Sequence, residues 1–243
     1  MKGIILAAGR GTRLKPLTYG IPKPLLPVGG RPVIDYVLDN MATAYPDVTE
    51  VFVAVSWMKE TIESYLRHTP RPKLHVETVT TLGWDTGGDL RAIAIEKDID
   101  EPVVVAYGDN VTTIDLGEMI AFHKQQGLPA TVALFEVPWE DASRFGIAEL
   151  SGGNVVTSFT EKPPEGTAKT NLANAGYYIL EPSVLQGIPH KKIKIESAIF
   201  PELAARGELA GFRCAPPYWL DIGTLDAYRK ANKMMEGLIP PPG

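Results

Sequence analysis

The sequence predicts an α/β fold, with a doubly wound and mostly parallel sheet followed by a β-rich second half. Apolar runs without polar alternation, at residues 3–8, 51–55 and 103–106, are typical of strands buried on both faces of a parallel sheet. Helical patterns separate these runs, as in the strand–helix alternation of doubly wound folds. Beyond residue 130 the apolar runs shorten and are divided by Gly, Pro and polar turns, which indicates more closely spaced strands.

Each helix and each later strand follows from a local pattern. Apolar spacing of three and four residues predicts the helices between the first strands, at 34–41, 62–66 and 88–97. Short strands are predicted in the second half at 131–137, 146–150, 155–159 and 173–180. A helix is expected over about 196–206. Thr224 has the side chain of an N-cap and predicts a last helix that runs to Met235 and stops before Gly237.

Composition and charge narrow the functional class. Of the 243 residues, 44% are hydrophobic and 22% are charged, so we expect a globular chain with a large core. The net charge of -5 argues against broad nucleic-acid binding, which needs a basic surface. Cys214 is the only cysteine, which suits a structural thiol in a reducing compartment. No signal-peptide pattern or membrane-length apolar run occurs, so we expect a cytoplasmic protein without a membrane partner.

The first 27 residues carry the strongest functional signal. The first strand feeds Gly9-Arg10-Gly11-Thr12-Arg13-Leu14, and a Pro-Lys-Pro segment that contains Lys23 follows. Glycines let backbone N–H groups approach phosphate oxygens, while Arg13 and Lys23 bring two cations to the same place. Leu14 stands where the Rossmann fingerprint needs a glycine, and the Walker Gly-Lys-Ser/Thr string is absent. The segment therefore predicts a triphosphate site outside both common motifs.

Two carboxylates follow the ends of predicted elements. Asp109 comes just past the strand at 103–106, where an oxygen ligand for Mg²⁺ belongs, although an Asx turn that ends the strand fits equally well. Asp221 lies just outside the start of the last helix, where it also fits a polar residue of a helix-entry turn. The histidines show no metal-ligand spacing, and we expect surface or structural roles for His68, His75, His123 and His190.

Together these segments resemble the sugar-1-phosphate nucleotidylyltransferase family, whose members make nucleotide sugars. The resemblance extends from Lys2 to about Met235 and is to the short form of the family, without a C-terminal β-helix domain. It implies a Rossmann-like nucleotidyltransferase fold and a Mg²⁺-dependent transfer of a nucleotidyl group from an NTP to a sugar 1-phosphate, with release of pyrophosphate. It also implies that Asp109, in a Gly-Asp motif, and Asp221, in a Trp-x-Asp-x-Gly-Thr motif, hold the Mg²⁺.

The resemblance assigns roles to the cations and to the nucleotide pocket. Arg13 would stabilise charge on the triphosphate and on the leaving pyrophosphate, and Lys23 would neutralise the phosphate region near the attack. With Asp109 and Asp221 they form the implied catalytic set. The residues implied to bind the nucleotide are Ala7, Ala8, Gly9, Gly11, Thr12, Arg13, Lys23, Asp85, Thr86, Gly87 and Asp109.

The second half resembles the family's sugar-phosphate site. Thr160-Glu161-Lys162-Pro163 is similar to its Glu-Lys-Pro motif, in which the glutamate accepts hydrogen bonds from sugar hydroxyls and the lysine binds the sugar 1-phosphate. Gly146 and Asn174 lie in segments that resemble the sugar pocket, where the first exposes its backbone and the second offers an amide. Without the resemblance, Glu161 and Lys162 fit a solvated turn. Gly146 and Asn174 then fit residues that merely interrupt or end a strand.

The stretch expected near the base departs from the family's pattern. It reads Thr81-Leu82-Gly83-Trp84-Asp85-Thr86-Gly87-Gly88-Asp89, with Asp85 at a position that aligns with glycine and without the glutamine of thymidylyl enzymes. UTP, GTP and dTTP therefore all stay open. The string is closer to that of short uridylyl enzymes for amino-sugar phosphates, or of the guanylyl group. A helix N-terminus at Gly87 and Gly88 is a further candidate contact to the nucleotide.

No linker-like stretch divides the chain, so we expect one domain over residues 1–237. Its nucleotide-binding half would cover about 1–128 and its sugar-phosphate half 129–237, with an extended tail at 238–243. The basic run at 190–194 is interpreted as a solvated face or an oligomer contact without chemistry, and a homo-oligomer stays open.

Two other functions fit parts of the pattern. A metal-dependent glycosyltransferase also has a nucleotide-binding sheet, but it typically shows an Asp-x-Asp motif, which Asp109-Asn110-Val111 lacks. A non-catalytic regulatory homologue would keep the fold and lose Arg13, Lys23 or a metal acid, all of which are present here. Release of pyrophosphate separates the expected enzyme from both alternatives.

Overall fold

Four parallel strands of the first half place their carboxyl ends at one edge of the sheet. The computed structural model describes residues 1–237. These strands are β1 (Lys2–Leu6), β4 (Glu50–Val55), β5 (His75–Thr80) and β6 (Val103–Tyr107). They lie in the order β6-β1-β4-β5, and every neighbouring pair among them is parallel. The loops that follow these strands therefore start at the same edge.

The second half attaches to this sheet through one long antiparallel strand. β11 (Leu172–Leu180) pairs with β6 and is buried along its whole length. The remaining strands extend from β11 and are β8 (Ala130–Glu136), β9 (Gly146–Leu150), β10 (Val156–Glu161) and β12 (Leu209–Arg213). Within residues 1–237, nine strands thus form one sheet that contains both halves of the chain. The predicted α/β class with a doubly wound sheet and a β-rich second half is confirmed.

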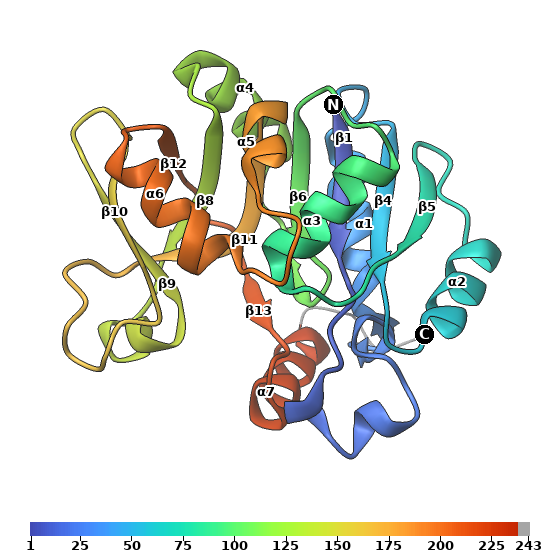
Figure 1. The fold of residues 1–243 in the computed structure, drawn as a ribbon. Coiled ribbons are helices and arrows are strands. Elements are labelled where there is room, and N and C mark those ends of the chain that lie inside the picture. Colours follow the sequence, from blue (N-terminus) through green and yellow to red (C-terminus); the bar gives the residue numbers. More distant parts are fainter. Residues whose placement is uncertain (238–243) are drawn as a thin grey trace.

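Helices cover both faces of the sheet (Figure 1). One face is covered by α1 (Val33–Thr43), α2 (Lys59–His68) and α4 (Leu116–Gln126), and the other by α3 (Asp85–Glu96), α5 (Pro182–Gly187) and α6 (Phe200–Ala205). Most buried side chains of the sheet belong to two hydrophobic cores, one on each face, because successive residues of a strand point to opposite faces. In β1, for example, Ile4 packs in one core and Ile5 in the other.

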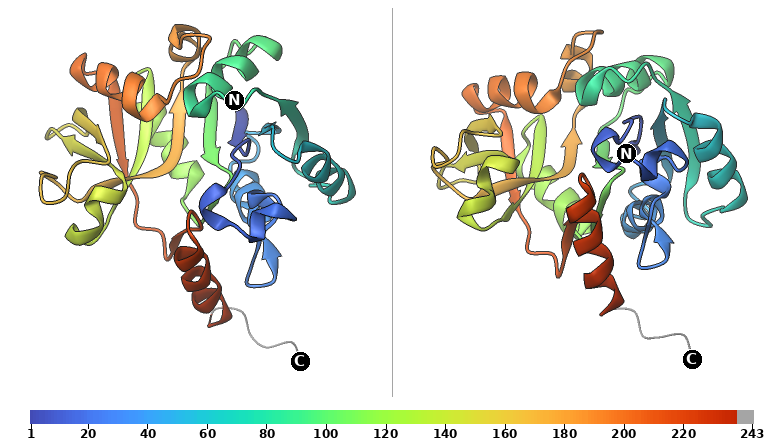
Figure 2. Two further views of the ribbon diagram at one scale, coloured as in Figure 1. Left: turned by 60° about the horizontal axis from the view of Figure 1, so that its bottom comes forward. Right: turned by 90° about the horizontal axis from the view of Figure 1, so that it is seen from below.

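A small substructure lies beneath the carboxyl edge of the sheet (Figures 1 and 2). It contains the paired strands β7 (Asn110–Thr112) and β13 (Trp219–Asp221), the helix α7 (Leu225–Glu236), and the paired strands β2 (Pro27–Val28) and β3 (Arg31–Pro32). Its apolar cluster includes Leu14, Val111 and Ile222, each fully buried. The loop after β1 and the last helix therefore share one core.

The predicted helices are present, and several of their boundaries differ from the predicted ones. The last helix begins after Thr224, whose hydroxyl accepts the Ala227 N–H at 3.2 Å, so the predicted N-cap is confirmed. Helix α3 already begins at Asp85, ahead of the predicted start. The helix predicted over about 196–206 is divided into a π-turn at Ile195–Ile199 and the short helix α6.

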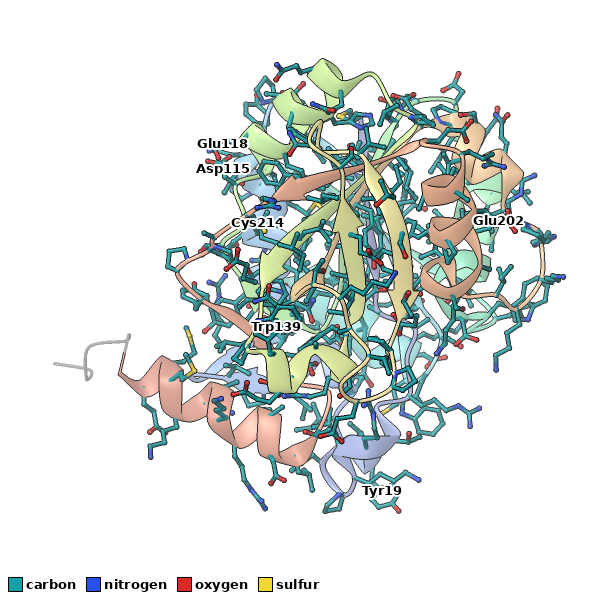
Figure 3. The ribbon with its side chains drawn as sticks, turned by 90° about the vertical axis from the view of Figure 1, so that its left-hand side faces the viewer. Tyr19, Asp115, Glu118, Trp139, Glu202 and Cys214 are labelled. Atoms are coloured by element: carbon teal, nitrogen blue, oxygen red, sulfur yellow. The ribbon has the colours of Figure 1, made fainter. Side chains whose placement is uncertain are left out.

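Several elements are not predicted from the sequence patterns, among them β5, β12 and α4. β5 reads His75-Val-Glu-Thr-Val-Thr and lies at the edge of the sheet, so its polar alternation differs from the apolar runs of the central strands. Helix α4 is recognisable by its cap, because the Asp115 carboxylate accepts the Glu118 N–H at 2.9 Å (Figure 3).

Cys214, labelled in Figure 3, lies partly buried beside β8. Its thiol donates to the Leu134 carbonyl oxygen at 3.3 Å. Burial raises the pKa of this thiol to about 12, which agrees with the expected structural role rather than a nucleophilic one.

Between residues 1 and 237, none of the helices combines the length and the apolar character that crossing a membrane requires. The tail predicted at 238–243 lies outside the described residues.

Candidate active site

A cavity of about 850 Å³ opens at the carboxyl edge of the sheet, where the segments after β1, β5 and β6 meet. In the right-hand view of Figure 2 this edge faces the reader, and the loop after β1 and helix α7 come to the front. Doubly wound folds bind their ligands at this edge, because parallel strands bring their following loops together there. The cavity is therefore the candidate active site.

Ten of the eleven residues predicted to bind the nucleotide line this cavity. They are Ala7, Ala8, Gly9, Gly11, Thr12, Arg13, Lys23, Asp85, Thr86 and Asp109. Gly87 is not among the lining residues. The fold thus brings the segments after three separate strands to one place.

The loop after β1 depends on Gly11, which has a φ of 60° in the left-handed region that favours glycine. The Thr18 hydroxyl donates to the Gly11 carbonyl at 2.9 Å, and a Cβ atom at residue 11 would lie 2.9 Å from Thr18 Cγ2. Arg13 follows in a 3-10 turn at Thr12–Leu14, and Lys23 begins another at Lys23–Leu25. Both cations reach the cavity from this tightly closed loop.

The glycine pair at the start of α3 packs against the segment around residue 193, and the nucleotide contact of Gly87 stays a prediction. The N–H groups of Gly87 and Gly88 both donate to the Ile193 carbonyl oxygen, at 2.9 and 3.1 Å. A Cβ atom at Gly88 would lie 2.5 Å from the Lys191 carbonyl oxygen. The glycines therefore let the chain around residue 193 lie directly against the helix, and their donors are occupied.

The basic run at 190–194 reaches the cavity with two of its lysines, which was not predicted, and its interpretation as a solvated face or an oligomer contact stays a prediction. Lys192 and Lys194 both line the cavity, and Lys192 Nζ lies 4.0 Å from Asp85 Oδ2. Ile193, between them, packs against the core on the α3 side of the sheet. The signal for this arrangement is the alternation of basic and apolar residues, which places the two lysines on one side of an extended segment.

The β7–β13 pair brings the two predicted metal carboxylates together. Asp221 is the last residue of β13 and pairs with Asn110, which follows Asp109 directly. Lys23 Nζ forms an ion pair with Asp109. Burial raises the pKa of Asp221, and the nearby charge of Asp109 raises it further.

The turn after Asp221 brings Arg13 to the same place. The Gly223 N–H donates to Asp221 Oδ1 at 2.6 Å. A Cβ atom at residue 223 would lie 2.9 Å from that oxygen and 3.4 Å from Arg13 Nη2. Glycine at this position therefore leaves room for both the Asp221 carboxylate and the Arg13 guanidinium beside residue 223.

A divalent cation fits this pair of carboxylates. The charge of Asp109 disfavours the ionised form of Asp221, whereas the charges of Lys23 and Arg13 favour it, so the pair is stabilised by added positive charge. Within residues 1–237, no group of three or more His, Cys, Asp or Glu side chains is placed to hold a metal ion. A metal ion held by these two carboxylates alone would need substrate oxygens and water to complete its coordination.

Three of the four predicted sugar-phosphate residues lie side by side. Gly146 pairs with Glu161 across β9 and β10, and a Cβ atom at residue 146 would lie 2.9 Å from Glu161 Oε2. The Lys162 N–H donates to the Phe145 carbonyl at 3.0 Å, and Lys162 Nζ lies 3.7 Å from Glu161 Oε1. Lys162 has a φ of 49°, a left-handed conformation that is uncommon for lysine. Such backbone conformations cluster at functional sites, which favours a binding turn over a solvated one.

Asn174, the fourth predicted residue, uses both polar atoms of its side chain in hydrogen bonds within β11. Its Nδ2 donates to the Tyr178 hydroxyl at 2.8 Å, and its Oδ1 accepts the Gly176 N–H at 2.8 Å. The pairing of β11 with β8 shifts register between Asn174 and Tyr178, and this side chain bridges the irregularity. A direct contact of Asn174 with a sugar stays a prediction.

A second hollow, of about 590 Å³, lies beside Asp221 and reaches Phe145, the neighbour of Gly146 in the chain. Asp221, Trp219 and Phe145 line it, together with one side of α7. The rings of Phe145 and Trp219 meet edge to face, with centroids 5.5 Å apart. Phe145 thus joins the turn at Lys162 to the strand that carries Asp221.

Asp85, the residue that departs from the family's pattern, has a backbone conformation that favours glycine. Asp85 has a φ of 59°, and its side chain is 36% exposed where it lines the cavity. Asp89 lies one helical turn further on, where it accepts the Trp84 N–H at 2.8 Å and burial raises its pKa. Asp89 therefore anchors the start of α3, whereas Asp85 is available to a ligand.

Comparisons with known proteins agree with this geometry. A family model described as nucleotidyl transferase matches residues 2–237. A mannose-1-phosphate guanyltransferase of Yarrowia lipolytica is 36% identical over 227 residues, which cover 92% of this chain and 61% of the relative. A UTP–glucose-1-phosphate uridylyltransferase of Synechocystis is 31% identical over 244 residues, which cover 95% of this chain and 62% of the relative. The chain thus spans about three fifths of the length of these two proteins.

A solved structure shares the whole fold. The crystal structure of a UDP-glucose pyrophosphorylase complexed with UDP-glucose matches with a TM-score of 0.83 at 22% identity. The match covers 98% of this chain and 99% of that one. The two chains therefore share one fold along nearly their whole lengths.

Proposed function

The chain belongs to the nucleotidyl transferase family, and on that premise we propose that it transfers a nucleotidyl group from an NTP to a sugar 1-phosphate, forming an NDP-sugar and pyrophosphate. The observation that carries the proposal is the meeting of cations and carboxylates at one place. Arg13 and Lys23 line a single cavity with Asp109, and Asp221 lies at its border beside Gly223. Opposite charges arranged in this way suit the binding of phosphates together with a metal ion.

The proposed reaction is an in-line displacement. An oxygen of the sugar 1-phosphate forms a bond to the α-phosphorus of the NTP, while the bond from that phosphorus to pyrophosphate breaks. No covalent bond to the protein is needed, so the protein acts by orientation and by charge stabilisation.

Three side chains would orient the two substrates and stabilise the charge on their phosphates. The ion pair with Asp109 holds the Lys23 ammonium where the phosphates would lie, so that charge is neutralised before the reaction begins. Arg13, close to Gly223 and Asp221, would stabilise the charge that moves to the leaving pyrophosphate. Lys162, beside Glu161, would hold the phosphate of the attacking sugar.

We propose Mg²⁺ as the metal, with Asp109 and Asp221 as its protein ligands. Carboxylate oxygens are the ligands that Mg²⁺ prefers, and it commonly takes one or two of them together with substrate phosphates. When bound, it would neutralise charge on the phosphate oxygens.

The names of the relatives suggest which substrates to test first. The Yarrowia relative is named for GTP transfer to mannose 1-phosphate and the Synechocystis relative for UTP and glucose 1-phosphate. An activity assay with GTP, UTP and dTTP, each combined with hexose and amino-hexose 1-phosphates, would identify the base and the sugar that this protein uses.

Pyrophosphate release is the measurement that tests the proposal. We expect pyrophosphate and an NDP-sugar in equal amounts with at least one pair of the panel, and no signal when either substrate is omitted. Release of a free nucleoside diphosphate from an NDP-sugar and an acceptor would indicate the glycosyltransferase alternative. Binding of substrates without turnover of any pair would indicate the regulatory alternative.

The remaining expectations stay predictions. They are the single domain over 1–237, the cytoplasmic location, the absence of nucleic-acid and membrane partners, and the open question of a homo-oligomer. The net charge of -5 supports the absence of a nucleic-acid partner.

A further inference from the structure

Glu196 is an acidic side chain that is buried behind the cavity and surrounded by hydroxyl groups. It is 4% exposed and lies in the π-turn Ile195–Ile199. Thr86 Oγ1 donates to its Oε2 at 2.7 Å, and the Tyr107 hydroxyl donates to its Oε1. The Tyr178 hydroxyl lies 3.3 Å from the same Oε1. A buried carboxyl group needs hydrogen-bond partners in place of water, and the hydroxyls of Thr86 and Tyr107 supply them, with the Tyr178 hydroxyl close by.

The three hydroxyls come from different sides of the candidate active site. Thr86 lies in the first turn of α3 and Tyr107 ends β6, and both line the cavity. Tyr178 lies on β11, where its hydroxyl accepts from Asn174 Nδ2 at 2.8 Å. Asn174 is one of the residues predicted for the sugar site. Glu196 therefore lies where the nucleotide side and the sugar side share one chain of hydrogen bonds.

The hydrogen bonds of this chain all lead to Glu196. Asn174 donates to Tyr178, the Tyr178 hydroxyl donates to the Tyr107 hydroxyl at 2.7 Å, and Tyr107 donates to Glu196. Thr86 donates to the carboxylate from the other side. Each hydroxyl has a single proton, so reversal of one bond forces the neighbouring hydroxyl to turn as well. The carboxylate is the common acceptor that fixes the direction of every bond.

Glu196 also helps to hold the π-turn against α3 at one side of the cavity. Thr86 Oγ1 accepts the Ile195 N–H at 3.1 Å while it donates to Glu196, so the π-turn and α3 are joined by two bonds at one hydroxyl. Lys192 and Lys194 immediately precede this turn and line the cavity. The position of both lysines therefore depends on the same hydrogen-bond chain.

We infer that Glu196 is a positioning residue that couples the two substrate sites, because it fixes the hydroxyls of Thr86 and Tyr107 on the nucleotide side and that of Tyr178 on the sugar side. Binding of one substrate would then order the hydroxyls that the other substrate requires. The inference rests on the proposed function, since it needs two substrates in adjoining sites. Coupling of this kind is reciprocal, so each substrate lowers the dissociation constant of the other by the same factor.

The coupling between the two substrates should also depend on pH, through the protonation of Glu196. Burial raises its pKa to about 7, although the hydrogen bond from Thr86 opposes the shift. The titratable groups packed around it are Asp85 of α3, Tyr107 of β6 and Tyr178 of β11. Protonated Glu196 becomes a donor and reverses part of the chain, so the coupling should weaken as the pH falls below about 7.

The test measures binding rather than turnover. The probe is the α,β-methylene analogue of the NTP that the wild-type protein uses best, and its dissociation constant is measured by calorimetry with and without saturating sugar 1-phosphate. Glu196→Gln keeps the shape of the side chain but replaces one acceptor by a donor, and Tyr178→Phe cuts the chain on the sugar side. Tyr177→Phe is the matched control, since Tyr177 is the neighbour of Tyr178 on β11 and its hydroxyl finds no hydrogen-bond partner within residues 1–237.

We expect the sugar 1-phosphate to tighten binding of the analogue about tenfold in the wild type at pH 8. The factor should fall to about 1 in Glu196→Gln and in Tyr178→Phe, and stay near ten in Tyr177→Phe. It should decrease in the wild type between pH 8 and pH 6 and be independent of pH in Glu196→Gln. Circular dichroism checks the fold of each variant, and if Glu196→Gln does not fold, Tyr178→Phe decides.

Three results would overturn the inference: a wild-type factor of 1, an unchanged factor in the folded Glu196→Gln and Tyr178→Phe variants, or an equal loss in Tyr177→Phe. Failure of the proposed function looks different. In that case the wild type neither turns over nor binds any NTP of the panel, and the inference is rejected with it.

Discussion

Lys23 and Asp109 form an ion pair at the carboxyl edge of the sheet, with the lysine side chain 12% exposed and the aspartate 29% exposed. The two residues follow β1 and β6, which are paired in parallel, so the pair is set by the order of strands in the sheet. A phosphate that enters the cavity therefore meets a cation that is already held in place, next to the carboxylates that we propose would hold Mg²⁺.

Replacement of either carboxylate by its amide should remove most of the activity and leave the fold intact. We expect Asp109→Asn and Asp221→Asn each to lower turnover by orders of magnitude, because each loses one of two ligand charges for Mg²⁺. Both residues lie at strand ends rather than in a hydrophobic core, so the melting temperature should change little. Pyrophosphate release at increasing Mg²⁺ concentration measures the effect. Near-normal turnover in both variants, or wild-type turnover in EDTA, would contradict the metal assignment.

Arg13→Ala should slow turnover more than it weakens binding of the sugar 1-phosphate. Its guanidinium lies near Gly223 and Asp221, where we place charge that develops on the leaving pyrophosphate, and one such contact is commonly worth about 3 kcal/mol. Turnover should therefore fall about a hundredfold. Arg206→Ala is the control, since Arg206 pairs with Glu208 on the exposed surface. Unchanged turnover with a raised KM for the sugar 1-phosphate would assign Arg13 to the other substrate.

Gly88→Ala should destabilise the protein, in contrast to another helical glycine. A Cβ atom at residue 88 would lie 2.5 Å from the Lys191 carbonyl oxygen and 2.6 Å from Trp84 Cβ, so the segment with Lys192 and Lys194 must move away. We expect a loss of about 2 kcal/mol in the free energy of unfolding, measured in urea. Gly117→Ala in α4 is the matched control, because a Cβ atom there meets only the Asp115 side chain at 3.3 Å. Equal stability of both variants would show that the packing at Gly88 is not required.

Local signals predicted the parts of the site that one segment builds. The loop around Gly11, which contains Arg13, and the cap at Thr224 are each closed by a partner within a few residues, at Thr18 and Ala227. Such features depend on short-range conformation, and for that reason the sequence patterns identify them.

Features built by distant segments could not be predicted in the same way. The β7–β13 pair consists of two strands of three residues each, and three residues show no periodicity. The partners of Glu196 come from α3, β6 and β11, so no single window of sequence contains them. The glycines at the start of α3 look like a phosphate-binding turn, because the pattern does not show that the Ile193 carbonyl takes their N–H groups.

The stability of the protein should depend on Glu196 in a pH range that follows from its pKa. Burial raises the pKa from 4.5 to about 7, so between these values the carboxyl stays protonated in the folded state and ionises when the chain unfolds. Its contribution to stability is therefore complete below pH 4.5 and is lost as the pH rises through about 7. Relative to Glu196→Gln, the wild type should lose up to about 3 kcal/mol of unfolding free energy across this range. Urea unfolding at pH 5 and pH 8 measures the difference, and parallel pH profiles of the two proteins would contradict it.

Lys162 separates the sugar-phosphate site from the nucleotide site, because it lies in the turn next to Glu161 and outside the lining of the nucleotide cavity. If its ammonium binds the incoming phosphate, Lys162→Ala removes a charge-assisted hydrogen bond worth about 1.5–3 kcal/mol. The KM for the sugar 1-phosphate should then rise by about one to two orders of magnitude, while the KM for the NTP changes little. Lys162→Arg should restore only part of the loss, since a planar guanidinium does not replace a compact ammonium.

The control for this last prediction is Lys169→Ala. Lys169 lies 3.4 Å from Glu149 and is 75% exposed, so it pairs with a glutamate as Lys162 does, but on the open surface. Steady-state rates with each substrate varied in turn separate the two KM values. If the turn at Lys162 is only solvated, both lysine variants will show wild-type kinetics. Equal increases of both KM values would also contradict the assignment, because they would place Lys162 where it affects the two substrates alike.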